Sequence, residues 1–244
     1  MKEYESDKRP ELKERRPDPF QIAIDGTVAS GKGATSRLLA EILGVLYLDT
    51  GAMYRCVAYL ALKQNISPSD EEALVEQLRR SNIVLRTPHD TEIDGRLITV
   101  LLNGDDVSWT IRSEEIGTLS AITSQHLKVR KELVAQQQQI ASKEPVVMEG
   151  RDISHKVLPK AKLKIFMDAD PMIRAQRRYR ELLSRGVATT FENVLTDLTV
   201  RDQRDFETNL RRVPGVWNID TSNMKVDEVV SLITTKARLL MDKS

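Results

Sequence analysis

A lysine follows two glycines at a spacing that suits the binding of phosphate groups. The pattern G-x-x-x-x-G-K spans Gly26 to Lys32, after an apolar run and before residues with helical periodicity. In such a unit the free backbone N–H groups and the positive end of the helix dipole face one point, and a lysine can bridge terminal phosphates. We expect the phosphate contacts to come from Gly26, Thr27, Val28, Ala29, Ser30, Gly31, Lys32, Gly33, Ala34 and Thr35.

The loop departs from the strict Walker A pattern at one position. A Ser or Thr should follow the lysine, and this chain has Gly33 there. The alternative is an ordinary tight turn with an exposed lysine. The strand-like run before the loop and the helical pattern after it favour phosphate binding over that alternative.

Charged residues also stand where other apolar runs end. Asp49 follows residues 45–48, Arg55 lies in the first turn of the next helical pattern, and Arg151 and Asp152 follow residues 145–148. Open α/β sheets bind ligands at the carboxyl ends of their strands, so these side chains are candidates for ligand contacts. An ordinary surface role stays the alternative for Arg55.

Arginines are concentrated in the last third of the chain. They crowd between Arg151 and Arg212, in a protein whose net charge is only +1. Such a cluster indicates a local site for a polyanion, although a solvated helix face with paired Asp and Glu explains some of its members. With Lys32 and Arg55, it suits phosphoryl transfer, in which an enzyme mostly positions two anions and neutralises charge. Asp49 and Asp152 could hold Mg²⁺ through water.

The elements that position these residues follow from the hydrophobic pattern. Residues 20–24, 45–48, 145–148, 164–168 and 216–219 read as buried strands, and helical periodicity falls between them. This alternation predicts an α/β fold with a parallel sheet. We expect helices at 33–43, from 52 onward, at 68–80, twice within 111–142, at 171–184, at 191–208 and at 226–240.

Two segments depart from the alternation of strands and helices. Residues 82–86, 91–94 and 97–102 alternate like antiparallel strands joined by the turn signals Asp94-Gly95 and Asn103-Gly104. They predict a small hairpin insertion. The two arginine-bearing helices that meet at Gly186 predict a movable flap.

Composition limits the class of protein. With 244 residues, 40% hydrophobic and 30% charged, the chain can bury one sizeable core. Its net charge of +1 argues against bulk binding to nucleic acid or membrane. No apolar run reaches the roughly 20 residues that span a bilayer, and no signal-peptide pattern precedes the first strand, so we expect a cytoplasmic protein. One cysteine and three scattered histidines predict neither a disulfide nor a zinc site. Residues 1–18 are highly charged and read as a disordered or loosely docked arm.

Six ordered blocks give the chain a resemblance to a known family. They are I-D-G-x-x-x-S-G-K-G from Ile24, L-D-T-G-A-M-Y-R from Leu48, D-V-S-x-x-I-R from Asp106, E-G-R-D from Glu149, K-I-F-M-D-A from Lys164 and R-D-x-R-D from Arg201. From about residue 20 onward the sequence resembles the bacterial cytidylate kinases, which are nucleoside monophosphate kinases. The resemblance implies a three-layer P-loop fold with a five-stranded parallel sheet, an insertion at about 66–112 and a lid at about 174–190.

The resemblance also implies an activity, which is transfer of a phosphoryl group from ATP-Mg²⁺ to CMP or dCMP by a monomeric enzyme. The implied catalytic residues are Lys32, Arg151, Asp152, Arg177 and Arg178, with the last two in the lid. The implied substrate contacts are Asp49, Thr50, Tyr54, Arg55, Arg130, Arg151, Asp152, Arg201 and Asp205. Among them, Arg130 and Asp152 would read the cytosine, Arg55 and Arg151 would hold the CMP phosphate, and Tyr54, Arg201 and Asp205 would place the ribose. No direct protein ligand to the metal is implied.

Three positions depart from the family pattern. Ala34 stands where a Thr or Ser is usual, with Thr35 one place later. Ala121 stands in place of a serine expected at the base, beside Ser120. Thr208 replaces a phosphate-binding arginine, for which Arg211 or Arg212 are possible substitutes.

Two alternatives stay open at the level of sequence. The three departures would suit a degraded kinase that binds nucleotide as a regulatory module. Another small-molecule P-loop kinase would share the loop, but it would not predict the hairpin insertion or E-G-R-D. Lys32 and the Arg151-Asp152 pair are intact, which favours an active (d)CMP kinase.

Overall fold

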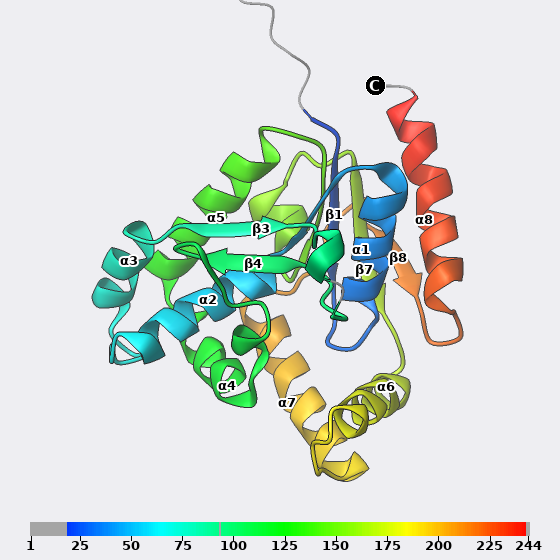
Figure 1. Cartoon of the computed structure of the whole chain (residues 1–244). Helices are drawn as coiled ribbons and strands as arrows, with labels where there is room; N and C mark the ends of the chain where they lie inside the picture. The colour runs from blue at the N-terminus through cyan, green and yellow to red at the C-terminus, as the bar shows by residue number, and fades with distance from the viewer. Residues whose placement is uncertain (1–18, 93, 243–244) are drawn as a thin grey trace, which may run out of the picture.

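The protein is built on one parallel β-sheet. A computed structural model describes residues 19–92 and 94–242, so the predicted arm at 1–18 lies outside the described residues. Five strands lie in the order β2-β6-β1-β7-β8, and every neighbouring pair is parallel (Figure 1). Their bounds are β1 Gln21–Gly26, β2 Leu46–Asp49, β6 Val146–Gly150, β7 Leu163–Asp168 and β8 Trp217–Asp220. The five predicted strands are therefore confirmed.

The central strand explains why the sequence shows unbroken apolar runs. Ile22, Ala23 and Ile24 of β1 are buried, because β1 pairs with β6 and β7 along its two edges and helical segments pack over both of its faces. A strand covered on both faces has no solvent side and so no polar alternation. The crossovers between parallel strands need helices, which supplies the two outer layers.

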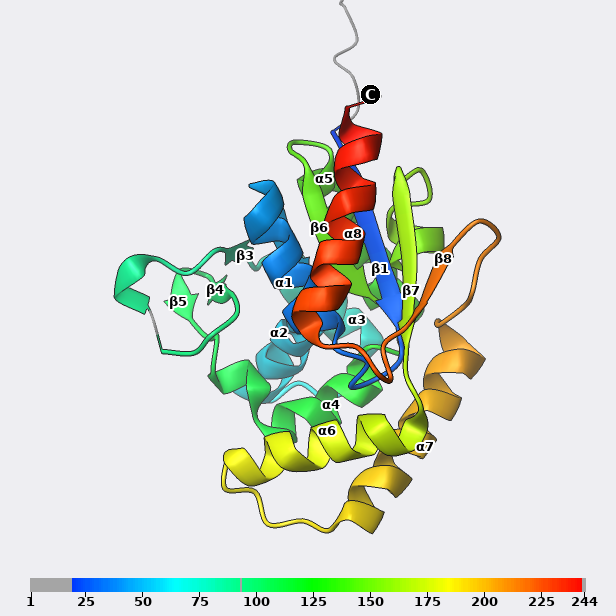
Figure 2. The same cartoon turned by 90° about the vertical axis from the view of Figure 1, so that its right-hand side faces the viewer.

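Helices cover both faces of the sheet. On one face α1 (Lys32–Leu43) packs against α8 (Val226–Met241), which stands in front of the strands in Figure 2. On the opposite side, α5 (Leu127–Ala141) packs on the π-helical turn η3 (Ile153–Val157), which in turn contacts β1. The three-layer α/β fold is thus as the sequence predicted. No helix in the described part of the chain is long and apolar enough to cross a membrane.

A second group of elements lies in the sequence between β2 and α5. It contains α2 (Thr50–Lys63), α3 (Glu71–Arg79), the short helix η2 (Thr110–Arg112), α4 (Glu114–Thr123) and an antiparallel sheet of β3 (Ile83–Arg86), β4 (Thr99–Leu102) and β5 (Asp105–Asp106). Asn103 and Gly104 join β4 to β5 with φ of 55° and 93°. Positive φ at both central residues is what a tight hairpin of this twist requires, so the Asn-Gly signal was read correctly.

One predicted strand is wrong. Residues 91, 92 and 94 are not in a strand: Asp90–Glu92 is a turn of 3₁₀ helix (η1), and the third strand of the small sheet is β5. The reason is the Glu92 side chain. Its carboxylate accepts hydrogen bonds from both terminal nitrogens of Arg86, at 2.7 Å each, and from the backbone N–H of His89 at 2.8 Å. These bonds fold the segment back on β3 instead of extending it.

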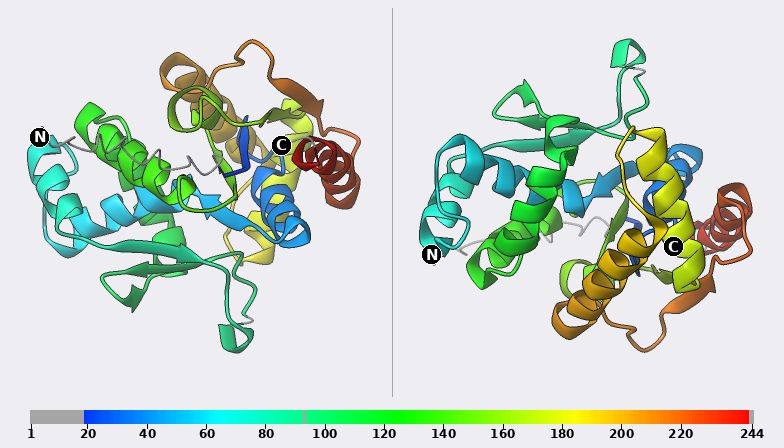
Figure 3. Two further views of the ribbon diagram at one scale, coloured as in Figure 1. Left: turned by 90° about the horizontal axis from the view of Figure 1, so that it is seen from above. Right: turned by 90° about the horizontal axis from the view of Figure 1, so that it is seen from below.

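The helices α6 (Pro171–Ser184) and α7 (Phe191–Thr208) form the predicted flap region. They pack on each other around a small core of their own, made of Ala175, Leu182 and Val194. Figure 3 (right) looks from below at the carboxyl edge of the sheet, with α4 on one side and α6 and α7 on the other. The edge where the sequence placed the ligand is therefore surrounded by helices. That α6 and α7 move as a lid, and the domain limits at 66–112 and 174–190, stay predictions.

Candidate active site

The glycine loop joins β1 to α1 at the carboxyl edge of the sheet. Gly26 has φ of 152°, and a Cβ atom there would lie 1.9 Å from the carbonyl oxygen of Met167. Gly31 is the N-cap of α1 and has φ of 89°, in the left-handed region. Both positions therefore require glycine, one for the close approach of β7 and one for the backbone angle.

The hydroxyl groups of the loop turn inward. Thr27 Oγ1 donates to Asp168 Oδ1 at 2.7 Å, and Ser30 Oγ donates to the carbonyl of Thr27 at 3.0 Å. Thr221, just after β8, donates to the carbonyl of Ser30 at 2.9 Å, and Arg174 of α6 donates to that of Val28 at 3.1 Å. The loop is thus held in shape before any ligand arrives, and its backbone N–H groups and Lys32 are left to contact an anion.

Lys32 is the buried cation of the loop. Its side chain is only 6% exposed, and Nζ donates to the carbonyl of Thr27 at 2.7 Å. Burial, and after it the positive charge of Arg151, lower the pKa of Lys32 to about 7, while Glu149 acts in the opposite direction. A phosphate beside this ammonium would restore its charge.

A carboxylate occupies the space beside Gly33. A Cβ atom on Gly33 would lie 3.1 Å from Glu149 Oε1 and 3.9 Å from the Tyr47 hydroxyl, which donates to Glu149 Oε1 at 2.8 Å. A Walker Ser or Thr would therefore meet Glu149, which explains the glycine. Burial and the charge of the neighbouring Asp49 raise the pKa of Glu149, whereas the charge of Lys32 acts in the opposite direction. Thr35 Oγ1, one place after Ala34, is buried and has no hydrogen-bond partner among the described residues, and its role at the phosphates stays a prediction.

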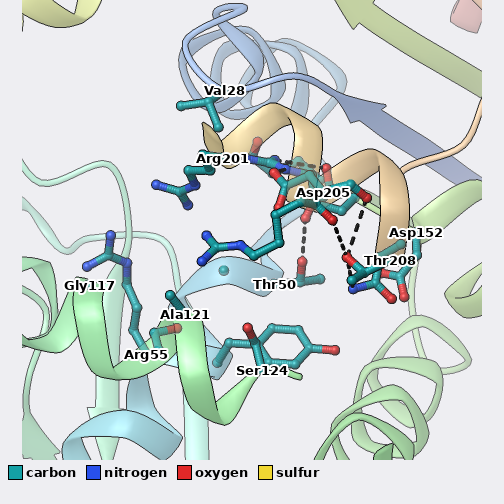
Figure 4. Close-up of a pocket in the computed structure, with 18 of the residues that line it drawn as sticks. Val28, Thr50, Arg55, Gly117, Ala121, Ser124, Asp152, Arg201, Asp205 and Thr208 are labelled. Atoms are coloured by element: carbon teal, nitrogen blue, oxygen red, sulfur yellow. Dashed lines mark hydrogen bonds and ion pairs between the residues drawn. The ribbon is translucent and has the colours of Figure 1, made fainter. Parts of the chain in front are cut away.

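A cavity of about 350 Å³ opens beside the loop. All the residues predicted to contact the monophosphate line it, although they come from segments far apart in the sequence: Asp49, Thr50, Tyr54, Arg55, Arg130, Arg151, Asp152, Arg201 and Asp205. Val28, Ala29 and Lys32 of the loop line it too. The structure thus brings the predicted substrate residues together next to the phosphate loop (Figure 4).

One end of the cavity carries a buried ion pair between Arg130 and Asp152, which are 9% and 4% exposed. Arg130 Nη1 also donates to the carbonyl of Ser124 at 3.2 Å, and the guanidinium lies 5.4 Å from the centre of the Tyr54 ring. The turn that presents Asp152 is fixed by Asp25 at the end of β1. Its carboxylate accepts from the backbone N–H groups of Ile153 and Ser154, at 2.7 and 2.9 Å.

The other part of the cavity is rich in arginine. Arg151 Nε donates to Asp205 Oδ2 at 2.7 Å, and Arg55 Nη1 donates to the carbonyl of Ile111 at 2.9 Å. Arg201 has no ion pair within the described part of the chain. Burial, and after it the charge of Arg151, lower the pKa of Arg201 to about 10. Figure 4 shows Arg55 and Arg201 on the same side of the pocket. This surplus of positive charge suits a phosphate.

The two lid arginines lie outside this cavity. Arg177 Nη2 donates to the carbonyl of Thr221 at 2.6 Å, which braces the segment that holds Ser30. Arg178 lies 3.0 Å from Glu181 and 3.7 Å from Glu114, and it lines an adjoining cavity of about 220 Å³ together with Arg55 and Arg201. Their roles in catalysis stay predictions.

Several lining residues were not singled out by the sequence. Arg112 donates to Asp49 Oδ2 at 3.2 Å, and its position in the D-V-S-x-x-I-R block was the available signal. Arg204, a fixed position of the R-D-x-R-D block, also lines the cavity, as do Ser124 and Gln125, which carried no separate signal. Arg212, a suggested substitute at position 208, instead pairs with Asp168 at 2.6 Å and lies over the Phe166 ring. Neither it nor Arg211 is among the lining residues, whereas Arg204 is.

A braced glycine loop with an arginine-rich cavity at its side, on a parallel sheet, places the chain among the P-loop phosphotransferases. The family model described as cytidylate kinase matches residues 22–239. Cytidylate kinases of Bacillus subtilis and Geobacillus kaustophilus are 40% and 42% identical to the chain, over 88% of its length and 94% of theirs. The chain belongs to the cytidylate kinase family, as the six blocks indicated.

Two matches among solved structures are both kinases. A shikimate kinase from Acinetobacter baumannii is 15% identical, with a TM-score of 0.44, over 92% of this chain and 95% of its own. A gluconokinase from Sinorhizobium meliloti is 17% identical, with a TM-score of 0.45, over 93% of this chain and 97% of its own.

Proposed function

We propose that the protein transfers the γ-phosphoryl group of ATP to CMP and releases CDP and ADP. The observation that carries the proposal is the buried Arg130–Asp152 pair at the end of the cavity, in a chain of the cytidylate kinase family. Cytosine presents an amino donor beside two acceptors. A carboxylate and a guanidinium complement that edge, and uracil, with a carbonyl in place of the amino group, does not match it.

The triphosphate belongs on the loop side. The backbone N–H groups at the start of α1 would hold its phosphate oxygens, and Lys32 would bridge the outer phosphates as a cation. Because the loop hydroxyls are already bonded within the protein, binding needs little rearrangement there. Such prior organisation lowers the entropy cost of holding the phosphoryl group in line.

The monophosphate would lie with its phosphate among Arg55, Arg151 and Arg201, close to the loop. One of its oxygens attacks the γ-phosphorus, a P–O bond forms, and the bond to the β-phosphate oxygen breaks, so that ADP leaves with the electron pair. The arginines neutralise the charge on the moving group. On lid closure Arg178 would reach the same place from α6, while Arg177 steadies the loop.

The acidic side chains near Lys32 fit a magnesium ion that is held through water. Glu149 and Asp49 end neighbouring strands and line the cavity. The described residues contain no group of three metal-ligating side chains, and Mg²⁺ usually keeps several waters when phosphates bind it. Bound in this way, it would offset negative charge on the phosphates.

The remaining roles rest on the family resemblance. Tyr54, Arg201 and Asp205 would place the ribose, and dCMP is included as a second substrate. We also infer a monomeric, cytoplasmic enzyme. Light scattering of the purified protein would test the oligomeric state, since a stable dimer would contradict that part of the proposal.

ADP production with a panel of acceptors tests the proposed reaction. Purified protein with ATP-Mg²⁺ is supplied in turn with CMP, dCMP, UMP, AMP and shikimate. We expect the fastest turnover with CMP or dCMP. Absence of turnover with every acceptor would favour a nucleotide-binding module, turnover of shikimate would indicate another small-molecule kinase, and faster turnover of UMP than CMP would overturn the assigned base.

A further inference from the structure

The part of the cavity that would hold the base has no polar side chain at position 121. Ala121 of α4 lines the cavity with a methyl group only. If the base is cytosine, its amino group brings two N–H donors, and each must find an acceptor when the pocket excludes water. Asp152 can supply one acceptor, because Arg130 contacts its Oδ2 and leaves Oδ1 available.

Gln125 lies one helical turn beyond Ala121 and lines the same cavity. Its side-chain nitrogen Nε2 donates to the carbonyl of Ala121 at 2.9 Å. Because that partner is a carbonyl oxygen, the amide orientation is fixed by the bond itself, and Oε1 is the atom left to face outward. Oε1 has no hydrogen-bond donor among the described residues. It can accept a hydrogen bond and cannot donate one.

The place of Gln125 in the cavity follows from Ser124, its neighbour in the sequence, which contacts the Arg130–Asp152 ion pair. The carbonyl of Ser124 accepts a hydrogen bond from Arg130 at 3.2 Å, so the end of α4 abuts the guanidinium that pairs with Asp152. Figure 4 shows Ser124 and Ala121 on one wall of the pocket. Gln125, which is exposed in the ligand-free protein, thus lines the same cavity as Asp152 and Arg130 and lies next to Ala121.

We propose that Gln125 is a specificity-determining residue, whose Oε1 accepts the second N–H of the cytosine amino group. This inference rests on the proposed function. The hydroxyl of Ser124 also lines the pocket, but a hydroxyl both donates and accepts, so it serves an amino group or a carbonyl equally well. An oxygen that only accepts repels the O4 carbonyl of uracil. Gln125 therefore favours CMP and disfavours UMP at the same point.

Equilibrium dissociation constants test this role without requiring turnover. Calorimetry would compare CMP, UMP and the monophosphate of 2-pyrimidinone riboside, which lacks the amino group, on wild type, Gln125→Met and Ser124→Ala. Gln139→Met, an exposed glutamine on α5, is the matched control. We expect Gln125→Met to lower the preference for CMP over UMP about tenfold, which corresponds to roughly one hydrogen bond and one removed repulsion. Gln139→Met should keep that preference, and so should Ser124→Ala, because the lost hydroxyl serves either base.

The 2-pyrimidinone nucleotide, which lacks the amino group, completes a double-mutant cycle with Gln125→Met. Loss of the amino group should weaken binding to wild type several-fold more than binding to Gln125→Met. The inference is overturned if the CMP preference of Gln125→Met lies within twofold of wild type, or if Ser124→Ala loses the preference instead. Wild-type protein that binds CMP no tighter than UMP overturns it as well. Failure of the proposed function looks different, because it is the absence of CDP formation by wild-type protein whatever its binding preference.

Discussion

The glycine loop and the arginine-rich cavity share one edge of the sheet, but they are held in different ways. In the loop, hydroxyls bond to backbone carbonyls and to one carboxylate: Ser30 to Thr27, Thr221 to Ser30, and Thr27 to Asp168. In the cavity, charged side chains from α2, α5, α7 and the segment after β6 are held by ion pairs such as Arg151–Asp205. The glycine loop is thus a fixed arrangement of backbone groups, whereas the cavity is lined by charged side chains.

The difference shows how each half recognises its ligand. The glycine loop offers N–H groups that are in place before the ligand binds, so its affinity for the triphosphate depends on the shape of the backbone. The cavity crowds like charges, and the lowered pKa values of Arg55 and Arg201 reflect burial together with neighbouring arginines. That crowding is unfavourable until an anion enters. We therefore expect substitutions in the cavity to act on the monophosphate and on the rate, and substitutions in the loop to act on the triphosphate.

The largest effect is expected for Arg151→Ala. The positive charge of this side chain lowers the pKa of Lys32, and its Nε donates to Asp205. It would hold the transferred group, so kcat should fall by about 10²–10³-fold while the fold persists. Steady-state kinetics and a thermal melt of the same sample provide the measurement. Arg80→Ala, on an exposed arginine paired with Glu76, is the matched control. Full activity of Arg151→Ala, or loss of its folded state, contradicts the assigned role.

The pH dependence of ATP binding tests the role of Lys32 and therefore of the loop. Because the pKa of Lys32 is lowered to about 7, its ammonium loses the proton as pH rises through that value in the ligand-free protein. A triphosphate favours the charged form, so binding above pH 7 should take up a proton, and ATP affinity should fall by up to about tenfold per pH unit.

Calorimetry of ATP binding at pH 8.5, in two buffers of different ionisation enthalpy, measures that proton uptake. Lys32→Met should abolish it. Equal proton uptake by wild type and Lys32→Met would assign the proton to another group and would contradict the role of Lys32.

The smallest effect is expected for Thr27→Val. It removes the hydrogen bond to Asp168 that braces the loop, a loss of about 1 kcal/mol. KM for ATP should rise about fivefold, while KM for CMP stays unchanged. Thr199→Val, whose hydroxyl bonds within the exposed face of α7, is the control. A change in KM for CMP of the same size would show that the two halves are not independent.

The sequence predicted those features that depend on local patterns. The loop from Gly26 to Lys32 and the Asn103-Gly104 turn are set by backbone angles that few residues adopt, and the buried strands by unbroken apolar runs. The predicted strand at 91–94 failed because the bonds that Glu92 makes to Arg86 and His89 depend on tertiary contacts.

The site shows the same limit. Its lining residues were found through motifs, but the partners of individual side chains were not. Arg177 binds the segment after β8, Arg212 binds Asp168, and Thr35 turns into the protein, none of which follows from spacing along the chain. Glu149 beside Gly33 emerged only from the packing of β6 against α1.

The most direct test of the account is the identity of the product. Phosphorus NMR of wild-type protein with ATP-Mg²⁺ and CMP would follow both nucleotides at once. The account predicts that the β-phosphate signal of CDP grows in step with that of ADP, because the phosphoryl group passes from the loop to the monophosphate among the arginines. ADP that forms together with inorganic phosphate, without CDP, would contradict it.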